Sequence, residues 1–155
     1  MKLYCAFIDY EKAFDTVIHD ALWVKLVQSG LSCKMLTVIK SIYQNVKSCV
    51  KNTDNNSFSQ FFDISLGVKQ GEPLSPLLFI LFINDITDSL DFENLTCQDI
   101  DTLSLHMLLF ADDIALFTTD PYSLQAQLNS IDTYSRKWGL KINVKNHLIK
   151  IDDYI

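Results

Sequence analysis

The pattern of apolar and polar positions divides the chain into short strands and longer helices. Apolar runs of about four to eight residues, bounded by polar turn residues, are typical of strands. Such runs are predicted to form strands at residues 3–8, 46–51, 58–64, 103–110, 114–119 and 140–144. Residues 92–102 are polar and are predicted to form a loop.

Four helices are predicted, each from a capping residue followed by apolar positions at helical spacing. Ser and Asp are favoured as N-caps because the side-chain oxygen accepts a hydrogen bond from a free backbone N–H, and Pro suits the first turn. The predicted helices are residues 20–30 with Asp20 as cap, 32–43 with Ser32, 75–90 with Ser75 and Pro76, and 120–139 with Asp120 and a closing Gly139. The resulting order β-α-α-β-β-α-β-β-α-β predicts an α+β fold with a mostly antiparallel sheet and helices packed on one face.

The composition indicates one globular domain. The 155 residues are 48% hydrophobic and 12% aromatic, with few glycines and prolines, which is far from a disordered composition and enough chain for a core. The most apolar stretch, Leu77–Ile83, is too short to span a bilayer. The apolar run near the N-terminus is broken by Asp9 and Glu11, so it is not a signal peptide. We therefore expect a chain without a membrane association.

The charge distribution is more informative than the net charge of −6. No Lys or Arg occurs between Lys69 and Arg136, whereas eleven Asp and Glu residues lie in that interval. Nucleic-acid affinity depends mainly on cations that neutralise phosphates. If this protein handles nucleic acid, metal ions or polypeptide outside this sequence must supply the positive charge.

Three carboxylates follow apolar strands. Asp112 and Asp113 lie at the tip of a predicted hairpin, and Asp9 ends the first predicted strand. Asp is common in turns, where its side chain is solvated, but adjacent carboxylates repel each other unless a cation lies between them. If the two strands were neighbours, the three groups would converge as a pair of divalent ions ~3.5–4 Å apart requires. Oxygen ligands of this kind favour Mg²⁺.

Four segments together resemble, in order, the motifs of the reverse transcriptases of non-LTR (LINE-type) retrotransposons. They are Phe7–Val17, Gly67–Phe79, Phe110–Asp113 and Trp138–Asn143. The resemblance covers nearly the whole chain and implies a polymerase palm. It also implies a nucleotidyltransferase, an RNA-directed DNA polymerase that adds dNTPs to a primer 3′-hydroxyl on an RNA template. The localisation stays open: if the protein is part of a retroelement ribonucleoprotein, an intracellular location, nuclear or cytoplasmic, is expected.

The resemblance also assigns roles around the carboxylates. Asp9 and Asp112 match the metal ligands of the family, and Asp113 completes the catalytic cluster. The backbone carbonyl of Tyr10 is a further candidate ligand. The implied cofactor is Mg²⁺, with Mn²⁺ as a substitute.

A second group of residues is implied to bind the nucleotide. Phe14 matches the aromatic residue that packs against the incoming sugar and disfavours a 2′-hydroxyl. Gln70 and Gly71 match the loop that lies against nucleotide and template, and Lys69 either contacts phosphate or is solvated. The family pattern places a Lys three positions after Asn143, whereas this chain has Lys145 at the second position, so Lys145 is a candidate in a shifted register.

Two other functions remain open from the sequence. One is a non-catalytic remnant of a decayed retroelement, which binds at most a metal or a protein partner. The other is a different palm-like enzyme, a nucleotide cyclase or an RNA-templated RNA polymerase, against which the loop from Gln70 to Pro76 argues. Because the sequence begins just before the first strand and ends at Ile155, we expect residues 1–155 to be a palm segment. Fingers and thumb are then largely absent, and activity of the segment alone is weak or missing.

Overall fold

The computed structural model describes residues 2–44, 46–69, 71–90, 98–100, 103–105, 107–145 and 148–153. The chain forms two compact units. The first contains residues 1–13 and 83–155, and the second contains residues 14–82.

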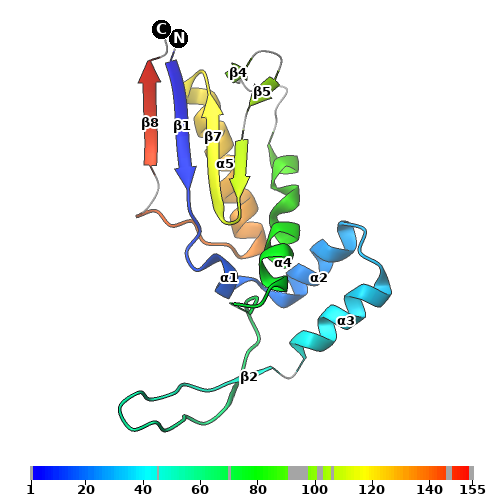
Figure 1. Cartoon of the computed structure of the whole chain (residues 1–155). Coiled ribbons are helices and arrows are strands. Elements are labelled where there is room, and N and C mark those ends of the chain that lie inside the picture. Colours follow the sequence, from blue (N-terminus) through cyan, green and yellow to red (C-terminus); the bar gives the residue numbers. More distant parts are fainter. Residues whose placement is uncertain are drawn as a thin grey trace. The chain divides into compact units, whose positions relative to one another are not determined.

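A four-stranded antiparallel sheet forms the centre of the first unit (Figure 1). Its strand order is β6-β7-β1-β8. The strands are β1 Lys2–Ile8, β6 Met107–Phe110, β7 Asp113–Thr118 and β8 Leu148–Asp153. A separate pair, β4 Gln98–Ile100 and β5 Leu103–Leu105, forms its own small sheet. The termini of the described chain pair with each other, because Lys2 lies opposite Asp153.

Helix α5 (Pro121–Trp138) covers one face of this sheet. Side chains alternate between the two faces of a strand, and the face that carries Ile8, Ile114 and Leu116 is buried. The helix begins where Asp120 accepts hydrogen bonds from two backbone N–H groups, both at 2.9 Å. It ends at Gly139, whose φ of 76° is left-handed. The short 3₁₀ helix η1 (Asn84–Ser89) also packs on α5.

The second unit is mostly helical. Its elements are α1 Ala13–Thr16, which starts at the unit boundary, α2 His19–Gln28, α3 Cys33–Tyr43, β2 Lys47–Ser48, β3 Phe62–Asp63 and α4 Leu74–Ile83. Helices α2 and α3 contact each other, and Leu78, Phe79 and Phe82 of α4 are buried. No helix among the described residues is both long and apolar enough to cross a membrane.

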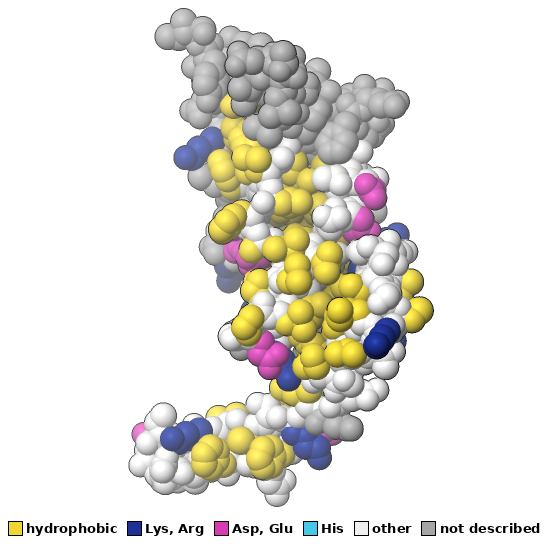
Figure 2. Space-filling view, turned by 45° about the vertical axis from the view of Figure 1, so that its right-hand side comes forward, with side chains coloured by type: hydrophobic (Ala, Val, Ile, Leu, Met, Phe, Trp, Pro, Cys, Tyr) yellow, Lys and Arg dark blue, Asp and Glu magenta, His cyan; other side chains and the backbone are white. Residues whose placement is uncertain are grey.

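The arm between β2 and β3 carries exposed aromatic side chains. Phe58 and Phe61 are 64% and 71% exposed, and Figure 2 shows hydrophobic side chains beside lysines along the arm at the bottom of the view. Strand pairing in the arm is sparse, with two residue pairs between β2 and β3 and one bridge from Lys51 to Phe58. A two-stranded hairpin with so little buried surface is marginally stable by itself.

The predicted fold class is confirmed, since the chain is α+β with an antiparallel sheet and a helix on one face. The caps Ser32 and Asp120 are also confirmed. The cap Asp20 is wrong, because α2 already begins at His19. The Ser75 cap is wrong as well, since Ser75 lies inside α4 and donates its hydroxyl to the Lys69 carbonyl at 2.5 Å. At the start of α2 the His19 side chain donates a hydrogen bond to the Gly67 carbonyl, and at α4 the Ser75 side chain donates to the Lys69 carbonyl. In both places this contact, made in the folded chain, overrides the local capping preference.

The predicted strand at residues 140–144 is also wrong. Within the described part of the chain, its one strand-like contact is an isolated bridge between Ile142 and Tyr10, and β8 forms later in the chain. The segment predicted as a loop at 92–102 contains β4, while its residues 92–97, 101 and 102 lie outside the described part. The predicted helix 75–90 changes to 3₁₀ geometry at Asn84. Short apolar runs do not reveal which partner strand is available, so pairing decides where the strands form.

Helix α5 carries a buried side-chain amide, that of Gln127. Gln127 is 1% exposed, and neither end of its side-chain amide has a hydrogen-bond partner among the described residues. Burying an unpaired amide costs on the order of 1–3 kcal/mol.

We therefore expect Gln127→Leu to raise the free energy of unfolding by about 1–2 kcal/mol. Urea denaturation followed by circular dichroism measures the change. The matched control is Gln125→Leu, because Gln125 is exposed on the same helix and its side-chain amide donates to Asn129 Oδ1. A Gln127→Leu chain no more stable than the control would show that the buried amide is satisfied.

Candidate active site

The strand register brings Asp9 and Asp113 to adjacent positions. Ile8 pairs with Ile114 across β1 and β7, so the next pair outward in an antiparallel ladder is Asp9 with Asp113. Ile8 and Ile114 point toward α5 and are buried. Since successive residues alternate between faces, the two aspartates lie on the opposite face of the sheet.

A shallow cavity opens on this face. Its volume is about 390 Å³. It is lined by Phe7, Ile8, Asp9, Leu108, Phe110, Asp113, Ile114 and Ala115. Phe110 is 82% exposed. The cavity therefore combines two carboxylates with an apolar wall.

Asp112 lies in the tight turn of the β6–β7 hairpin. Phe110 pairs with Asp113, which leaves Ala111 and Asp112 as the turn residues. Ala111 has a φ of 54°, a left-handed conformation that costs an L-residue roughly 1–2 kcal/mol. Such backbone strain often marks a functional site.

The three carboxylates are close enough to influence one another. Burial raises the pKa of Asp112, its own backbone N–H lowers the pKa, and the negative charges of Asp113 and Asp9 raise it further. A cation placed among them would remove this repulsion.

These residues fit a divalent ion that shares its coordination with a substrate. Among the described residues, no three His, Cys, Asp or Glu side chains already converge as a complete metal-binding group. Mg²⁺ does not need one, since it usually keeps several waters and binds one or two carboxylates plus substrate phosphates. Asp9, Asp112 and Asp113 offer that kind of oxygen set.

Asn143 contacts Asp9 twice. Its side-chain Nδ2 donates to Asp9 Oδ2 at 3.0 Å, and its backbone N–H donates to the Asp9 carbonyl at 2.8 Å. Asn143 was not predicted to be part of the site, although it ends the last of the four motifs. The contact spans 134 positions, so no local pattern could reveal it.

Tyr10 is held by its side chain. Tyr10 is 2% exposed, and its hydroxyl lies 2.9 Å from Ser135 Oγ on α5. Burial raises the pKa of Tyr10, and the hydrogen bond to Ser135 lowers it less. The bridge to Ile142 is closed by the Asp9 carbonyl and the Glu11 N–H, so this bridge does not use the Tyr10 carbonyl.

The predicted nucleotide-binding residues lie in the second unit. Phe14 is half-buried, with its ring centroid 4.8 Å from that of Phe79. Lys69 Nζ forms an ion pair with Glu72 at 3.2 Å and lies 5.7 Å from the Tyr43 ring centroid. Gly71 is exposed with a φ of 85°. Gln70 lies outside the described residues.

Lys145, the candidate for a shifted register, is exposed in the first unit. Its backbone N–H donates to Asn143 Oδ1 at 3.2 Å. The turn that carries this lysine is therefore tied to the residue that contacts Asp9.

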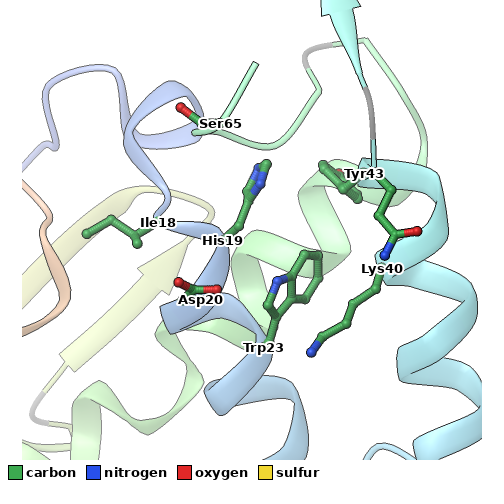
Figure 3. Close-up of a pocket in the computed structure, with 8 residues that line it drawn as sticks. Ile18, His19, Asp20, Trp23, Lys40, Tyr43 and Ser65 are labelled. Atoms are coloured by element: carbon green, nitrogen blue, oxygen red, sulfur yellow. The ribbon is translucent and has the colours of Figure 1, made fainter. Parts of the chain in front are cut away.

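The second unit contains an aromatic cavity that the sequence analysis missed (Figure 3). Its volume is about 460 Å³, and His19 and Trp23 of α2 face Tyr43 and Lys40 of α3. The His19 ring lies edge-on to Tyr43, with centroids 5.3 Å apart. His19 Nε2 donates to the Gly67 carbonyl at 2.8 Å. The spacing of one helical turn between His19 and Trp23 was the available signal.

The antiparallel sheet, the acid-tipped β6–β7 hairpin and helix α5 on the buried face of the sheet match the palm-like fold that was predicted. The sequence model of the family described as "Reverse transcriptase (RNA-dependent DNA polymerase)" matches residues 1–148. The chain therefore belongs to the reverse transcriptase family, and the family assignment made from the four motifs is confirmed.

Relatives in non-LTR retrotransposons support the same family. The chain is 32% identical over 140 residues to the Pol polyprotein of the R2 element of Nasonia vitripennis, covering 90% of this chain and 13% of that protein. It is 31% identical over 145 residues to the RNA-directed DNA polymerase from mobile element jockey of Drosophila funebris, covering 88% and 15%. The chain thus spans a small part of each relative.

Solved structures show the same fold. Apo telomerase from Candida tropicalis matches with a TM-score of 0.74 at 15% identity, over 96% of this chain and 28% of that one. Telomerase from Candida albicans in complex with a fragment of telomeric RNA matches with a TM-score of 0.72 at 16% identity, over 97% and 28%. At this identity the likeness concerns the fold alone.

Proposed function

We propose that this chain carries the catalytic centre of an RNA-directed DNA polymerase that adds dNTPs to a primer 3′-hydroxyl opposite an RNA template. The observation that carries the proposal is the β1–β7 register, which places Asp9 beside Asp113 and next to the turn of Asp112. The jockey relative, a named RNA-directed DNA polymerase, supports the reaction.

Asp9, Asp112 and Asp113, with the Tyr10 carbonyl, are the proposed holders of Mg²⁺ or Mn²⁺. Bound divalent ions supply Lewis acidity that favours ionisation of the primer hydroxyl and departure of pyrophosphate. The chain provides the negative charge that attracts these ions and a rigid strand pair that fixes the spacing of the carboxylates.

The nucleotide itself is proposed to contact the second unit. Phe14 is held in place by Phe79, and a firmly packed ring can exclude a 2′-hydroxyl better than a mobile one. Gly71 presents backbone without a Cβ, which allows close approach. Lys69, whose Nζ lies 3.2 Å from Glu72 Oε1, is the proposed contact to the triphosphate. Base pairing with the template then supplies the sequence information.

The proposed partners carry more phosphate than this chain can neutralise. No Lys or Arg lies between Lys69 and Arg136, and polyanion binding rests on such cations. We therefore treat residues 1–155 as a palm segment that works with bound ions and with further polypeptide.

A chimera tests this function. Residues 1–148 would replace the matching segment of the jockey polymerase, to which the chain is 31% identical. We expect Mg²⁺-dependent primer extension on an RNA template. Absence of synthesis, in a chimera that folds and binds the primer–template, would favour a non-catalytic remnant instead.

Phe14→Val in this chimera is expected to raise incorporation of rNTPs relative to dNTPs by roughly 10–100-fold, the range in which a pocket discriminates one small group. Competitive primer extension with the two nucleotide types measures the ratio. Phe61→Val is the matched control, because Phe61 is 71% exposed on the β2–β3 arm. Unchanged sugar selectivity would reduce Phe14 to a packing residue.

A further inference from the structure

Both ends of the Asn143 side-chain amide are engaged. Nδ2 donates to Asp9 Oδ2 at 3.0 Å, while Oδ1 accepts the backbone N–H of Lys145 at 3.2 Å. A backbone N–H can only donate and an ionised carboxylate can only accept. The two partners therefore fix which end of the amide faces Asp9.

Backbone hydrogen bonds join residues 141 and 143 to the residues that follow β1. The Asn143 N–H donates to the Asp9 carbonyl, and the Glu11 N–H donates to the Lys141 carbonyl, both at 2.8 Å. Lys141 Nζ also lies 2.6 Å from Glu11 Oε2. This double anchor leaves the amide little freedom to move away from the carboxylate.

Other asparagines in the chain show what an ordinary turn contact looks like. Asn52 and Asn55 each accept the N–H two residues further on, at 2.9 and 3.1 Å, as Asn143 does. Asn143 differs because its donor end also faces a half-buried acid. The difference indicates that its amide serves Asp9 as well as the turn.

We propose that Asn143 is a positioning residue that holds the Asp9 carboxylate in the orientation required for divalent-ion binding. The hydrogen bond occupies Oδ2 and leaves Oδ1 for the ion. This inference rests on the proposed function, because it assumes that Asp9 is a metal ligand. Partners that orient a ligand typically affect metal affinity by about 10–100-fold.

The test uses the 155-residue chain and the Mg²⁺ dependence of its thermal unfolding. Binding to the folded state alone raises stability with ion concentration. In Asn143→Ser the shorter hydroxyl can still accept the Lys145 N–H but does not reach Asp9. We expect the Mg²⁺ concentration for half-maximal stabilisation to rise about 10-fold or more, with little change in the unfolding temperature in EDTA.

The matched control is Asn55→Ser, which alters the same type of turn in the second unit and should leave the Mg²⁺ response unchanged. A half-maximal concentration in Asn143→Ser equal to that of the wild type would overturn the inference while leaving the metal site intact. A wild-type chain that does not respond to Mg²⁺ or Mn²⁺ would overturn the metal site itself.

A swapped pair keeps the inference testable if Asn143→Ser does not fold. Asn143→Asp places two carboxylates in contact and should lower the unfolding temperature in EDTA. When Asp9→Asn is added, the amide at position 9 can donate a hydrogen bond to the carboxylate at position 143, which reverses the direction of the wild-type bond. The double variant should therefore recover most of the lost unfolding temperature. No recovery in the double variant would show that the two side chains do not interact.

Discussion

Asp112→Asn in the jockey chimera is expected to lower the rate of RNA-templated DNA synthesis on the order of 10³-fold or more. Loss of a metal-binding carboxylate removes several kcal/mol of transition-state stabilisation. The same change should make the 155-residue chain slightly more stable in EDTA, because it removes one of three mutually repelling charges. In Mg²⁺ the variant should gain less stability than the wild type.

These opposite effects distinguish a metal site from simple damage to the fold. Primer extension and thermal unfolding with and without Mg²⁺ measure them. Asp54→Asn, which removes the same charge from the exposed tip of the β2–β3 arm, is the control and should change neither quantity. Asp112→Asn that is less stable in EDTA, or that extends primers at the wild-type rate, would contradict the assignment.

Gly67→Ala is expected to destabilise the second unit by roughly 3 kcal/mol or more, the largest stability effect that we predict. Gly67 has a φ of 85°, and a Cβ there would lie 2.9 Å from the Asp15 carbonyl oxygen. The left-handed conformation alone costs roughly 1–2 kcal/mol. The contact with a fixed backbone atom adds overpacking strain of about 1–3 kcal/mol.

Gly71→Ala separates the cost of the left-handed conformation from the cost of the contact with Asp15. Gly71 has the same φ of 85°, but among the described residues, its chain neighbours aside, no atom lies within 4 Å of an added Cβ. Its cost in unfolding free energy should be the conformational part alone, about 1–2 kcal/mol, whereas its effect on nucleotide KM in the chimera should be the larger of the two. Urea denaturation compares the stabilities, and equal losses in both variants would show that the contact with Asp15 relaxes freely.

Local chemistry made much of the fold predictable. The cap Asp120 and the closing Gly139 mark α5 because their side chain and backbone satisfy the ends of that helix without help from elsewhere. The β6–β7 hairpin was predictable because two apolar runs flank a short polar turn. The start of α2 was not, since His19 bonds to Gly67, 48 positions away.

The candidate site also has a part that local sequence predicted and a part that it did not. The sequence placed Asp9 and Asp112 at strand ends, which is a local property. Their proximity depends on which strand lies beside β1, and the strand at 140–144 was predicted wrongly for the same reason. Short apolar runs do not identify their partners, because pairing energy comes from cross-strand contacts.

The sequence by itself determined the α+β class, most helices, the acid-tipped hairpin and, through four motifs in order, the polymerase family. Each of these depends on residues close together in the chain or on motif spacing. Only the tertiary structure decided the β6-β7-β1-β8 order, the approach of Asp9 to Asp113, and the contact of Asn143 with Asp9. These depend on the register between distant strands, which is selected by burial of Ile8, Ile114 and Leu116 under α5 rather than by any local preference.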